Sequence, residues 1–405
     1  MKILFTTPEI KHPPVGGPYL RIENSIKALN KVSELHLVAR ASKESIGGDR
    51  AEKFYKHHCK RFLYSPSFFD ENKKTFSYKL RSIFYGKKSF EKKSDSDFII
   101  DYAKKHNIKT IWFGYGNISY DLMKEIKAKA PELKLVCDTD SVWSRFVLRG
   151  LPYARTEEEK SRIEADGKQK EKEEADWVKF CDVTTAVSEV DAEYYQSLAQ
   201  DKDKIKVFSN VIDLANYQKK LPPPRHFKKP NIYFAGYFGP NSPTDIAARW
   251  IINDILPIIQ KSIPDIHFYV LGRASDTTLA DIENPSVTIT GQLDSVLPYL
   301  HNADVALVPL KFESGTRFKI LEAAACRIPL VSTTLGAEGI PIKDEENILI
   351  ADDAQGFADA ILRLLGDKGM SDKIARNCKE LIDANYGLDK QELEALSIIE
   401  FLKQQ

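Results

Sequence analysis

The side chains best suited to chemistry lie in one ten-residue run, ESGTRFKILE, at residues 313–322. An apolar stretch at residues 305–309 precedes this run and predicts a buried strand. Gly315 and Thr316 are therefore expected in the loop where that strand ends and a helix begins. The first turn of a helix attracts anions, because its backbone N–H groups lack partners and its dipole is positive there. The sequence thus predicts an anion site, with phosphate as its natural ligand.

Arg317 and Lys319 add two cations to the start of the predicted helix. Positive charge is locally unfavourable there, because it opposes the helix dipole. A bound diphosphate would make the same charges favourable. Glu322 lies about one turn further along, where a carboxylate is suited to accept hydrogen bonds from ribose hydroxyls. The alternative is an ordinary surface helix whose charges face water.

The elements that must position this run follow a repeating pattern of strand and helix. Short apolar runs alternate with stretches of helical spacing, which is typical of βαβ units and a parallel sheet with helices on both faces. In the first half of the chain the predicted strands are residues 2–6, 33–39, 110–113, 133–137 and 182–187. In the second half they are residues 232–235, 266–271, 287–290, 305–309, 329–332 and 348–351.

A proline-rich, charged segment at residues 221–230 separates the two series and is typical of a linker. We therefore expect an α/β protein with two doubly wound, Rossmann-like domains and a cleft between the carboxyl ends of their strands. The predicted units are residues 1–208, a linker at 209–230, residues 231–385, and a C-terminal helix at 386–405. That helix has apolar positions at Leu393, Leu396, Ile399 and Leu402, and is expected to pack back across the first domain.

Composition limits the class of protein. The chain has 405 residues, of which 42% are hydrophobic and 29% charged, and its formal net charge is +1. These values exclude a single small module and mainly disordered protein, and they give no overall case for nucleic-acid binding. No apolar run is long enough to span a bilayer, and five widely spaced cysteines predict reduced thiols. The expected location is the cytoplasm.

Several motifs in chain order resemble glycosyltransferase family 4. The run at residues 313–322 is similar to the nucleotide-sugar site of that family. GGPYLR at residues 16–21 resembles its N-terminal glycine loop, and NVID at residues 210–213 resembles its interdomain turn. FAGYFGPN at residues 234–241 and STTLGAEG at residues 332–339 resemble loops of its second domain. The resemblance implies the GT-B architecture of two Rossmann-like domains.

The resemblance also implies an activity, which is retaining transfer of a hexose from a nucleoside diphosphate sugar to an acceptor, with no metal or other cofactor. Gly16 and Gly17 would let the backbone approach the donor phosphate or the acceptor. Arg317 and Lys319 would hold the diphosphate, and Glu322 the ribose. The full set of residues expected at the donor is Gly16, Gly17, Gly236, Asn241, Gly315, Thr316, Arg317, Lys319 and Glu322, with Glu313 and Ser314 at the sugar.

Three positions depart from the family pattern. Ser314 stands where many relatives have a glutamate, with Glu313 one residue earlier. The Arg and Lys usually found after the first strand of the second domain are absent around residues 236–241. No histidine follows the strand at residues 133–137, so His12 is the one imidazole expected near the glycine loop, where a surface role is an equal alternative.

Asp138 and Asp140 follow that strand instead and are the candidate catalytic residues. One carboxylate is expected to orient or deprotonate the acceptor hydroxyl, or to bind sugar hydroxyls. A second interpretation is an Asp-x-Asp metal site like that of the GT-A glycosyltransferases. A third is a helix N-cap formed by Asp140 or Ser141.

Residues 50–93 hold a local charge excess of 13 Lys or Arg over 4 Asp or Glu, interleaved with aromatic side chains. One interpretation is a peripheral membrane contact that presents a lipid-linked acceptor, because basic residues attract anionic headgroups and aromatic rings enter the interface. The alternatives are a solvated insertion on the acceptor side and, more remotely, a nucleic-acid patch.

The predicted function is hexose transfer to a saccharide or lipid-linked saccharide in polysaccharide or glycolipid assembly, without a nucleic-acid partner. Two other functions remain open. One is a nucleotide-sugar epimerase of the same fold, and the other is a non-catalytic nucleotide-sugar-binding protein. The base, the sugar and the acceptor depend on pocket shape and are not predicted.

Overall fold

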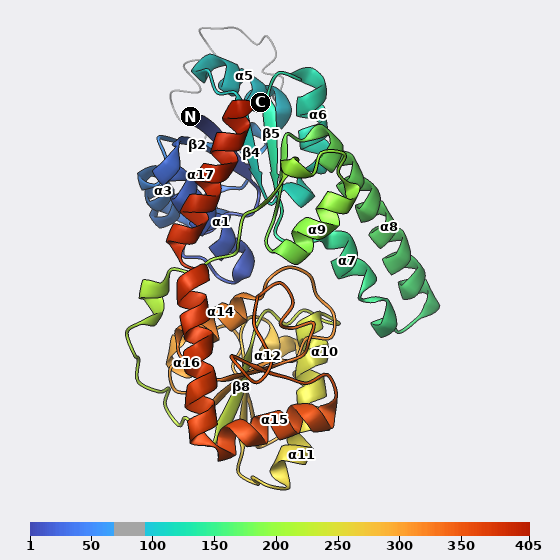
Figure 1. Cartoon of the computed structure of the whole chain (residues 1–405), viewed down its shortest axis with the longest axis vertical. Coiled ribbons are helices and arrows are strands. Elements are labelled where there is room, and N and C mark those ends of the chain that lie inside the picture. Colours follow the sequence, from blue (N-terminus) through green and yellow to red (C-terminus); the bar gives the residue numbers. More distant parts are fainter. Residues whose placement is uncertain (69–93) are drawn as a thin grey trace, which may run out of the picture.

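A computed structural model describes residues 1–68 and 94–405 and arranges them as two α/β domains, one above the other (Figure 1). Each domain is built on one sheet, in which all neighbouring strands pair in parallel. The strand orders are β3-β2-β1-β4-β5-β6-β7 and β10-β9-β8-β11-β12-β13. The chain changes direction beside β1 in one sheet and beside β8 in the other, and ligands of open α/β sheets bind at such points. The predicted pair of doubly wound domains is confirmed.

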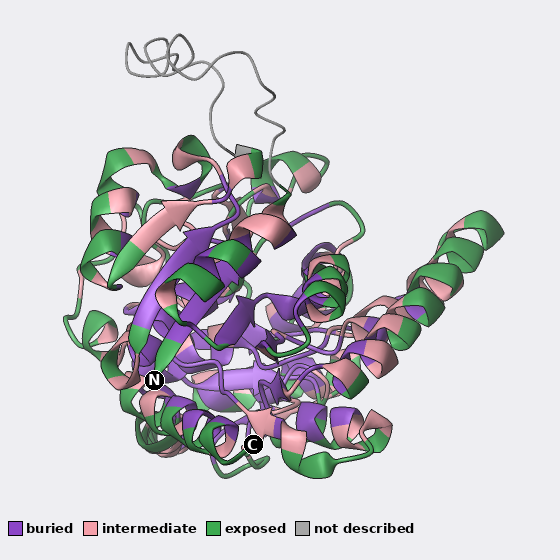
Figure 2. Cartoon of the chain, turned by 90° about the horizontal axis from the view of Figure 1, so that it is seen from above, coloured by how far each residue is buried: buried purple, intermediate pink, exposed green. Residues whose placement is uncertain are grey.

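The interior strands of the first sheet are almost wholly buried, because helices cover both faces (Figure 2). The sequence predicts these five strands and misses the two at the edges, β3 and β7. Edge strands are short here, and their sequences RFLY and IKV carry charge, so the apolar run that marks a central strand is lacking. The strands are β1 (Lys2–Thr7), β2 (Glu34–Ala39), β3 (Arg61–Tyr64), β4 (Thr110–Gly114), β5 (Lys134–Asp138), β6 (Val183–Ala186) and β7 (Ile205–Val207).

The helices around this sheet include one, α8, that projects from the domain and is largely exposed along its first half (Figures 1 and 2). Its acidic first turn and Thr156 N-cap fit the helix dipole. The helices are α1 (Gly17–Val32), α2 (Lys43–Ile46), α3 (Gly48–His57), α5 (Asp95–His106), α6 (Tyr120–Lys129), α7 (Trp143–Leu148), α8 (Glu157–Phe180) and α9 (Glu189–Leu198).

The second domain contains the larger hydrophobic cluster of the described chain. All six of its strands are predicted from the sequence. They are β8 (Asn231–Ala235), β9 (His267–Leu271), β10 (Val287–Ile289), β11 (Val305–Val308), β12 (Leu330–Ser332) and β13 (Leu349–Ile350). The helices are α10 (Pro243–Trp250), α11 (Leu256–Gln260), α12 (Ser275–Thr278), α13 (Leu297–Leu300), α14 (Phe318–Ala325), α15 (Ala354–Gly366) and α16 (Lys368–Asn385).

The C-terminal helix α17 (Leu388–Gln404) leaves the second domain and runs along α1 of the first, as predicted (Figure 1). The predicted apolar face is partly wrong, because Leu393 is 66% exposed and Leu396 37% exposed. Ile399 and Leu402 are buried as predicted, and Ala395 and Ile398 take the place of the other two positions in the core of the first domain.

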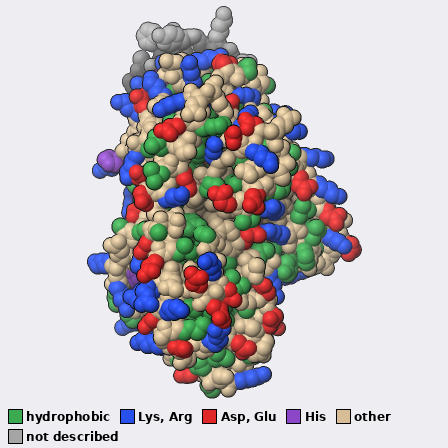
Figure 3. All heavy atoms as spheres, viewed as in Figure 1, with side chains coloured by type: hydrophobic (Ala, Val, Ile, Leu, Met, Phe, Trp, Pro, Cys, Tyr) green, Lys and Arg blue, Asp and Glu red, His purple; other side chains and the backbone are tan. Residues whose placement is uncertain are grey.

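The basic aromatic segment at residues 50–93 falls into two parts. Its described part forms α3 and β3, in which Tyr55 is fully buried and Phe62 packs against the core. Residues 69–93 lie outside the described residues, so the membrane interpretation rests on sequence there. No helix in the described chain is long and apolar enough to cross a membrane. On the face shown in Figure 3, Lys and Arg are intermixed with Asp and Glu, in line with the small net charge. All five cysteines are free thiols.

Candidate active site

A cavity of about 670 Å³ lies between the two domains, where the carboxyl ends of their strands face each other. Most of the predicted catalytic, donor-binding and sugar-binding residues line it. From the first domain these are Gly16, Gly17 and Asp140, and from the second Gly236, Glu313, Ser314, Thr316, Arg317, Lys319 and Glu322. Asp138, Asn241 and Gly315 do not line it, and the last two lie in loops beside lining residues. The structure therefore brings most of the predicted site residues together around one cavity.

The helix that faces the cavity is α14, and it begins one residue later than the run suggests. Arg317 has an extended backbone and occupies the N-cap position, and no side chain caps the helix. No acidic residue lies in its first turn. The first N–H groups of α14 are therefore without a side-chain acceptor, which leaves their partial positive charge available to an anion in the cavity.

The guanidinium of Arg317 is nearly fully buried, at 4% exposure, yet only partly hydrogen-bonded. Its Nη2 donates to the Leu335 carbonyl at 3.2 Å, while Nε and Nη1 have no hydrogen-bond partner among the described residues. Burial lowers the pKa of Arg317, and the nearby carboxylates of Glu313 and Glu338 only partly offset this effect. Unpaired buried donors are costly unless a ligand satisfies them. The guanidinium of Arg317 is thus a candidate group for binding an anion.

Lys319 places a second unpaired cation on the same wall. Its ammonium lies 5.1 Å from the centre of the Phe234 ring and makes no hydrogen bond or ion pair with any residue described. A Cβ added to Gly236 would lie 3.9 Å from the Nζ atom, so the ammonium sits beneath the loop that follows β8. Burial lowers the pKa of Lys319 to about 8. Lys319 therefore occupies the neighbourhood from which the family's usual cations are absent.

Glu322 faces the cavity from the next turn of α14. The Tyr217 hydroxyl donates to its Oε1 atom at 3.0 Å. Burial raises the pKa of Glu322, although the Tyr217 hydrogen bond and the charge of Lys319 oppose this. The Oε2 atom makes no hydrogen bond with a described residue, so one carboxylate oxygen is free for a ligand hydroxyl.

The loop before α14 docks on the first domain. Ser314 Oγ accepts a hydrogen bond from the Val142 amide at 3.2 Å, and Thr316 Oγ1 accepts one from Asn210 at 2.8 Å. Gly315 has a φ of 78°, and a Cβ there would lie 2.8 Å from the Asp140 carbonyl oxygen. Only glycine satisfies both the left-handed backbone and this close approach. Gly315 thus shapes the loop, while its neighbours form the cavity wall.

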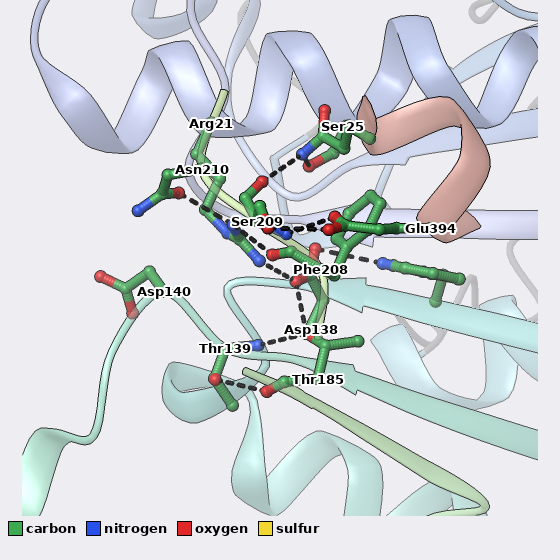
Figure 4. A network of polar contacts seen from close by, with 12 residues as sticks. Arg21, Ser25, Asp138, Thr139, Asp140, Thr185, Phe208, Ser209, Asn210 and Glu394 are labelled. Atoms are coloured by element: carbon green, nitrogen blue, oxygen red, sulfur yellow. Dashed lines mark hydrogen bonds and ion pairs between the residues drawn. The ribbon is translucent and has the colours of Figure 1, made fainter. Parts of the chain in front are cut away.

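Asp138 is part of a buried network instead of the cavity wall (Figure 4). Its carboxylate forms an ion pair with Arg21 and accepts hydrogen bonds from Trp112 at 3.1 Å and Thr185 at 2.8 Å. Arg21 in turn donates to Asn210 at 2.8 Å. The oxygens of Asp138 are therefore committed to protein donors. The structure places this candidate catalytic residue in a supporting role, behind the cavity.

Asp140 has the opposite environment, since its side chain points away from the network of Figure 4 and lines the cavity. Asn117 and Trp143 donate to its Oδ1 atom at 2.6 and 3.0 Å, and the Tyr115 hydroxyl also hydrogen-bonds to the carboxylate. Desolvation raises the pKa of Asp140 in spite of these bonds. The carboxylate is thus held in one orientation with its proton affinity increased, as a group that handles a hydroxyl proton requires.

Two alternative interpretations of these aspartates do not fit the geometry. The N-cap of α7 is Val142, with no side-chain hydrogen bond, so neither Asp140 nor Ser141 caps that helix. A shared metal site needs both carboxylates on one face, whereas Asp138 faces the Arg21 network and Asp140 faces the cavity. No group of three potential metal-ligating side chains occurs within residues 1–68 and 94–405.

Sequence reasoning misses Arg273, which lines the cavity directly after β9. Its guanidinium lies 4.3 Å from the centre of the Tyr237 ring and makes no hydrogen bond or ion pair with a described residue. The sequence signal that could have found it is a Gly-Arg pair at the end of a predicted strand, Gly272 and Arg273.

His12, the imidazole expected near the glycine loop, does not line the cavity. Its ring stacks on Phe54 with the ring centres 3.7 Å apart, and its Nδ1 atom lies 2.8 Å from Glu23 Oε2.

Comparison with known proteins gives a family match for the second domain. Residues 229–367 match the family model described as Glycosyl transferases group 1. An uncharacterized 44.6 kDa protein in the cps region of Klebsiella pneumoniae is 26% identical over 170 residues, which cover 40% of this chain and 43% of that protein. The chain thus matches less than half the length of this curated relative.

Solved structures match along the whole chain. HepE of Anabaena in complex with UDP-glucose superposes with a TM-score of 0.63 at 13% identity, covering 100% of both chains. Sucrose-phosphate synthase of Thermosynechococcus elongatus gives 0.67 at 16% identity, covering 100% of this chain and 98% of that one. A glycosyltransferase from Rickettsia africae gives 0.65 at 14% identity, with 100% and 99% covered.

The chain has the GT-B fold. Two facing Rossmann-like domains, a cavity between them and a C-terminal helix that crosses back are all present. In this GT-B protein the family match covers α14, Arg317 and Lys319.

Proposed function

We propose that the protein transfers a hexose, with retention of configuration, from a nucleoside diphosphate sugar to a hydroxyl of a saccharide or lipid-linked saccharide. One observation carries the proposal. Arg317 and Lys319 present unpaired cationic donors beside the uncapped start of α14, inside the cavity between the domains. A diphosphate supplies the acceptor oxygens and the negative charge that this arrangement lacks.

Residues on the two walls of the cavity have different proposed roles. Arg317, Lys319 and the α14 amides hold the diphosphate and stabilise the charge that develops on it as the glycosidic bond breaks. Arg273 adds a third cation on the same wall. Glu322 accepts a hydrogen bond from a ribose hydroxyl, and Asp140 orients or deprotonates the acceptor hydroxyl from the opposite wall.

Three further observations support this assignment. The family match is to Glycosyl transferases group 1, and structures that superpose on the chain include HepE bound to UDP-glucose. The curated relative is described as a protein in a cps region, which favours polysaccharide assembly as the process.

We propose a reaction without a metal cofactor, because the cationic groups on the donor wall are those of the chain itself. Activity that EDTA abolishes and Mn²⁺ restores contradicts this part.

The test is binding followed by turnover. Calorimetry against UDP, GDP, ADP and CMP, and their sugar conjugates, is expected to show one nucleotide that binds clearly more tightly than the others. The matching sugar donor should release free nucleoside diphosphate faster when a saccharide acceptor is added. Release that water alone supports at the full rate favours an epimerase, and binding without turnover across a broad acceptor panel favours a non-catalytic binder. Absence of binding to every nucleotide overturns the proposal.

A further inference from the structure

Arg149 joins the two domains at the loop that carries Glu313. This arginine follows α7 in the first domain. Its Nη1 atom donates to the Glu313 carbonyl at 2.7 Å, and its Nη1 and Nη2 atoms bind the two carboxylate oxygens of Glu338 at 2.7 and 2.8 Å. Both partners belong to the second domain. Such a forked arginine–carboxylate pair fixes distance and orientation together.

Contacts on either side of Glu313 also hold this loop against the first domain. The rings of Tyr153 and Phe312 stack with their centres 4.9 Å apart, and the Val142 amide donates to Ser314 Oγ. The backbone around Glu313 is thus held by the first domain at three successive residues of the second. The position of Glu313 in the cavity depends on the contact between domains as well as on the sheet beneath it.

The Arg149–Glu338 pair also affects the ionisation of Glu338. Although burial opposes ionisation, the hydrogen bonds and charge of Arg149 hold the pKa of Glu338 below its ordinary value. Glu338 also lies close enough to Arg317 to influence its charge. With Arg149 in place, Glu338 is already paired, and Arg317 forms no ion pair with it in the described chain.

We infer that Arg149 is a positioning residue, whose bridge to Glu338 and the Glu313 carbonyl holds the domains closed and sets the sugar side of the donor site. The inference rests on the proposed function for its kinetic part. In a transferase, Asp140 and Glu313 must stand at a fixed separation on opposite walls, and small errors of position lower turnover strongly. The diphosphate subsite lies within the second domain, so its affinity is expected to be largely independent of the bridge.

The decisive variant removes both charges at once. Arg149→Met with Glu338→Gln breaks the bridge without leaving an unpaired carboxylate beside Arg317. Turnover of the sugar donor is expected to fall roughly 10- to 100-fold, while the affinity for the free nucleoside diphosphate stays within about twofold. Arg149→Lys keeps the charge but loses the fork, and should give an intermediate rate. Arg155→Met is the matched control, because Arg155 is exposed and its side chain makes no hydrogen bond or ion pair in the described chain.

X-ray scattering of the ligand-free protein tests the bridge without relying on the function. The double variant is expected to have a larger radius of gyration than wild type, and the Arg155→Met control is expected to match wild type. A double variant with both wild-type scattering and wild-type turnover overturns the inference. Equal losses of turnover and diphosphate affinity also overturn it, because they indicate general damage to the site. If wild type binds no nucleotide, the proposed function fails, while the scattering result still decides whether Arg149 holds the domains together.

Discussion

Lys319 carries a prediction about pH. Its pKa is lowered to about 8 by burial, so the free protein begins to lose this cation as the pH rises through 8. A bound diphosphate restores the charge, and binding near pH 8 should therefore take up a proton. We expect the affinity for the nucleoside diphosphate to weaken between about pH 7.5 and 9, by up to roughly tenfold for each pH unit above 8. Calorimetry in buffers of different ionisation enthalpy measures both effects.

Lys319→Arg is the control for this prediction, because a guanidinium stays charged throughout that range. The affinity of Lys319→Arg for the nucleoside diphosphate should change with pH only through titration of the ligand itself. An equal pH dependence in wild type and Lys319→Arg removes Lys319 as the titrating group.

Arg317 supplies a prediction about affinity. Arg317→Gln removes a buried charge whose Nε and Nη1 atoms have no protein partner. A hydrogen bond to a charged group contributes about 1.5 to 3 kcal/mol, so nucleoside diphosphate affinity should fall roughly 10- to 150-fold. Arg376→Gln is the matched control, since Arg376 is exposed on α16 of the same domain. Unchanged affinity in Arg317→Gln, measured by calorimetry, contradicts the site assignment.

Asp140 supplies a prediction about catalysis. Because desolvation raises its pKa, the ionised form that can accept a hydroxyl proton is complete only at a pH above the usual titration range of aspartate, about 3.9. The acidic limb of kcat/KM should therefore lie above that range. Asp140→Asn should lower kcat far more than donor affinity. Full turnover in Asp140→Asn would show that Asp140 has a structural role and no catalytic one.

Residues that are adjacent in sequence were the predictable part of the site. Arg317, Lys319 and Glu322 lie within one helical turn or two, so their spacing alone predicts a common wall. Arg273 belongs to another strand, and Asp138 and Asp140 differ only in which way each side chain turns after β5. Such differences are fixed by contacts with Arg21, Trp112 and Asn117 from distant segments, which no local pattern contains.

At the scale of elements, Asp138 connects β5 to α1 and to the segment after β7. It pairs with Arg21, which also donates to the Phe208 carbonyl at 3.1 Å, and both charged side chains are at most 1% exposed. Asp138→Asn leaves the Arg21 charge buried without a counter-ion. Breaking a buried pair in this way costs about 3 to 5 kcal/mol of the free energy of unfolding.

Urea unfolding followed by circular dichroism measures that loss. Asp166→Asn is the control, because Asp166 is exposed on α8 of the same domain. We expect the first domain of Asp138→Asn to unfold at a clearly lower urea concentration than in wild type or the control. Equal unfolding midpoints would show that the network adds little to stability.

The interior strands were predictable because they are apolar on both faces, as parallel strands under two helix layers must be. The edge strands β3 and β7 were not predictable, because each is short and carries a charged residue, whereas the edge strands β10 and β13 of the second sheet are uncharged and were predicted. The face of α17 was also misjudged. Helical periodicity alone allows more than one apolar stripe along α17. The stripe that contains Ala395 and Ile398 is identified only by its packing against the first domain.

At the scale of the whole molecule, the net charge of +1 conceals the excess at residues 50–93. The membrane interpretation predicts that the protein floats with anionic liposomes at low salt, stays behind with neutral ones, and is released at high ionic strength, where surface charges are screened. Protein that stays with the unbound fraction at low salt contradicts this interpretation and favours a solvated insertion.

The C-terminal crossing has a consequence for the order in which the protein is made. α17 completes the core of the first domain, yet it leaves the ribosome only after the entire second domain. During synthesis the surface of α1 that contacts α17 stays exposed while the second domain is produced. The first domain is thus begun before the second domain and completed after it.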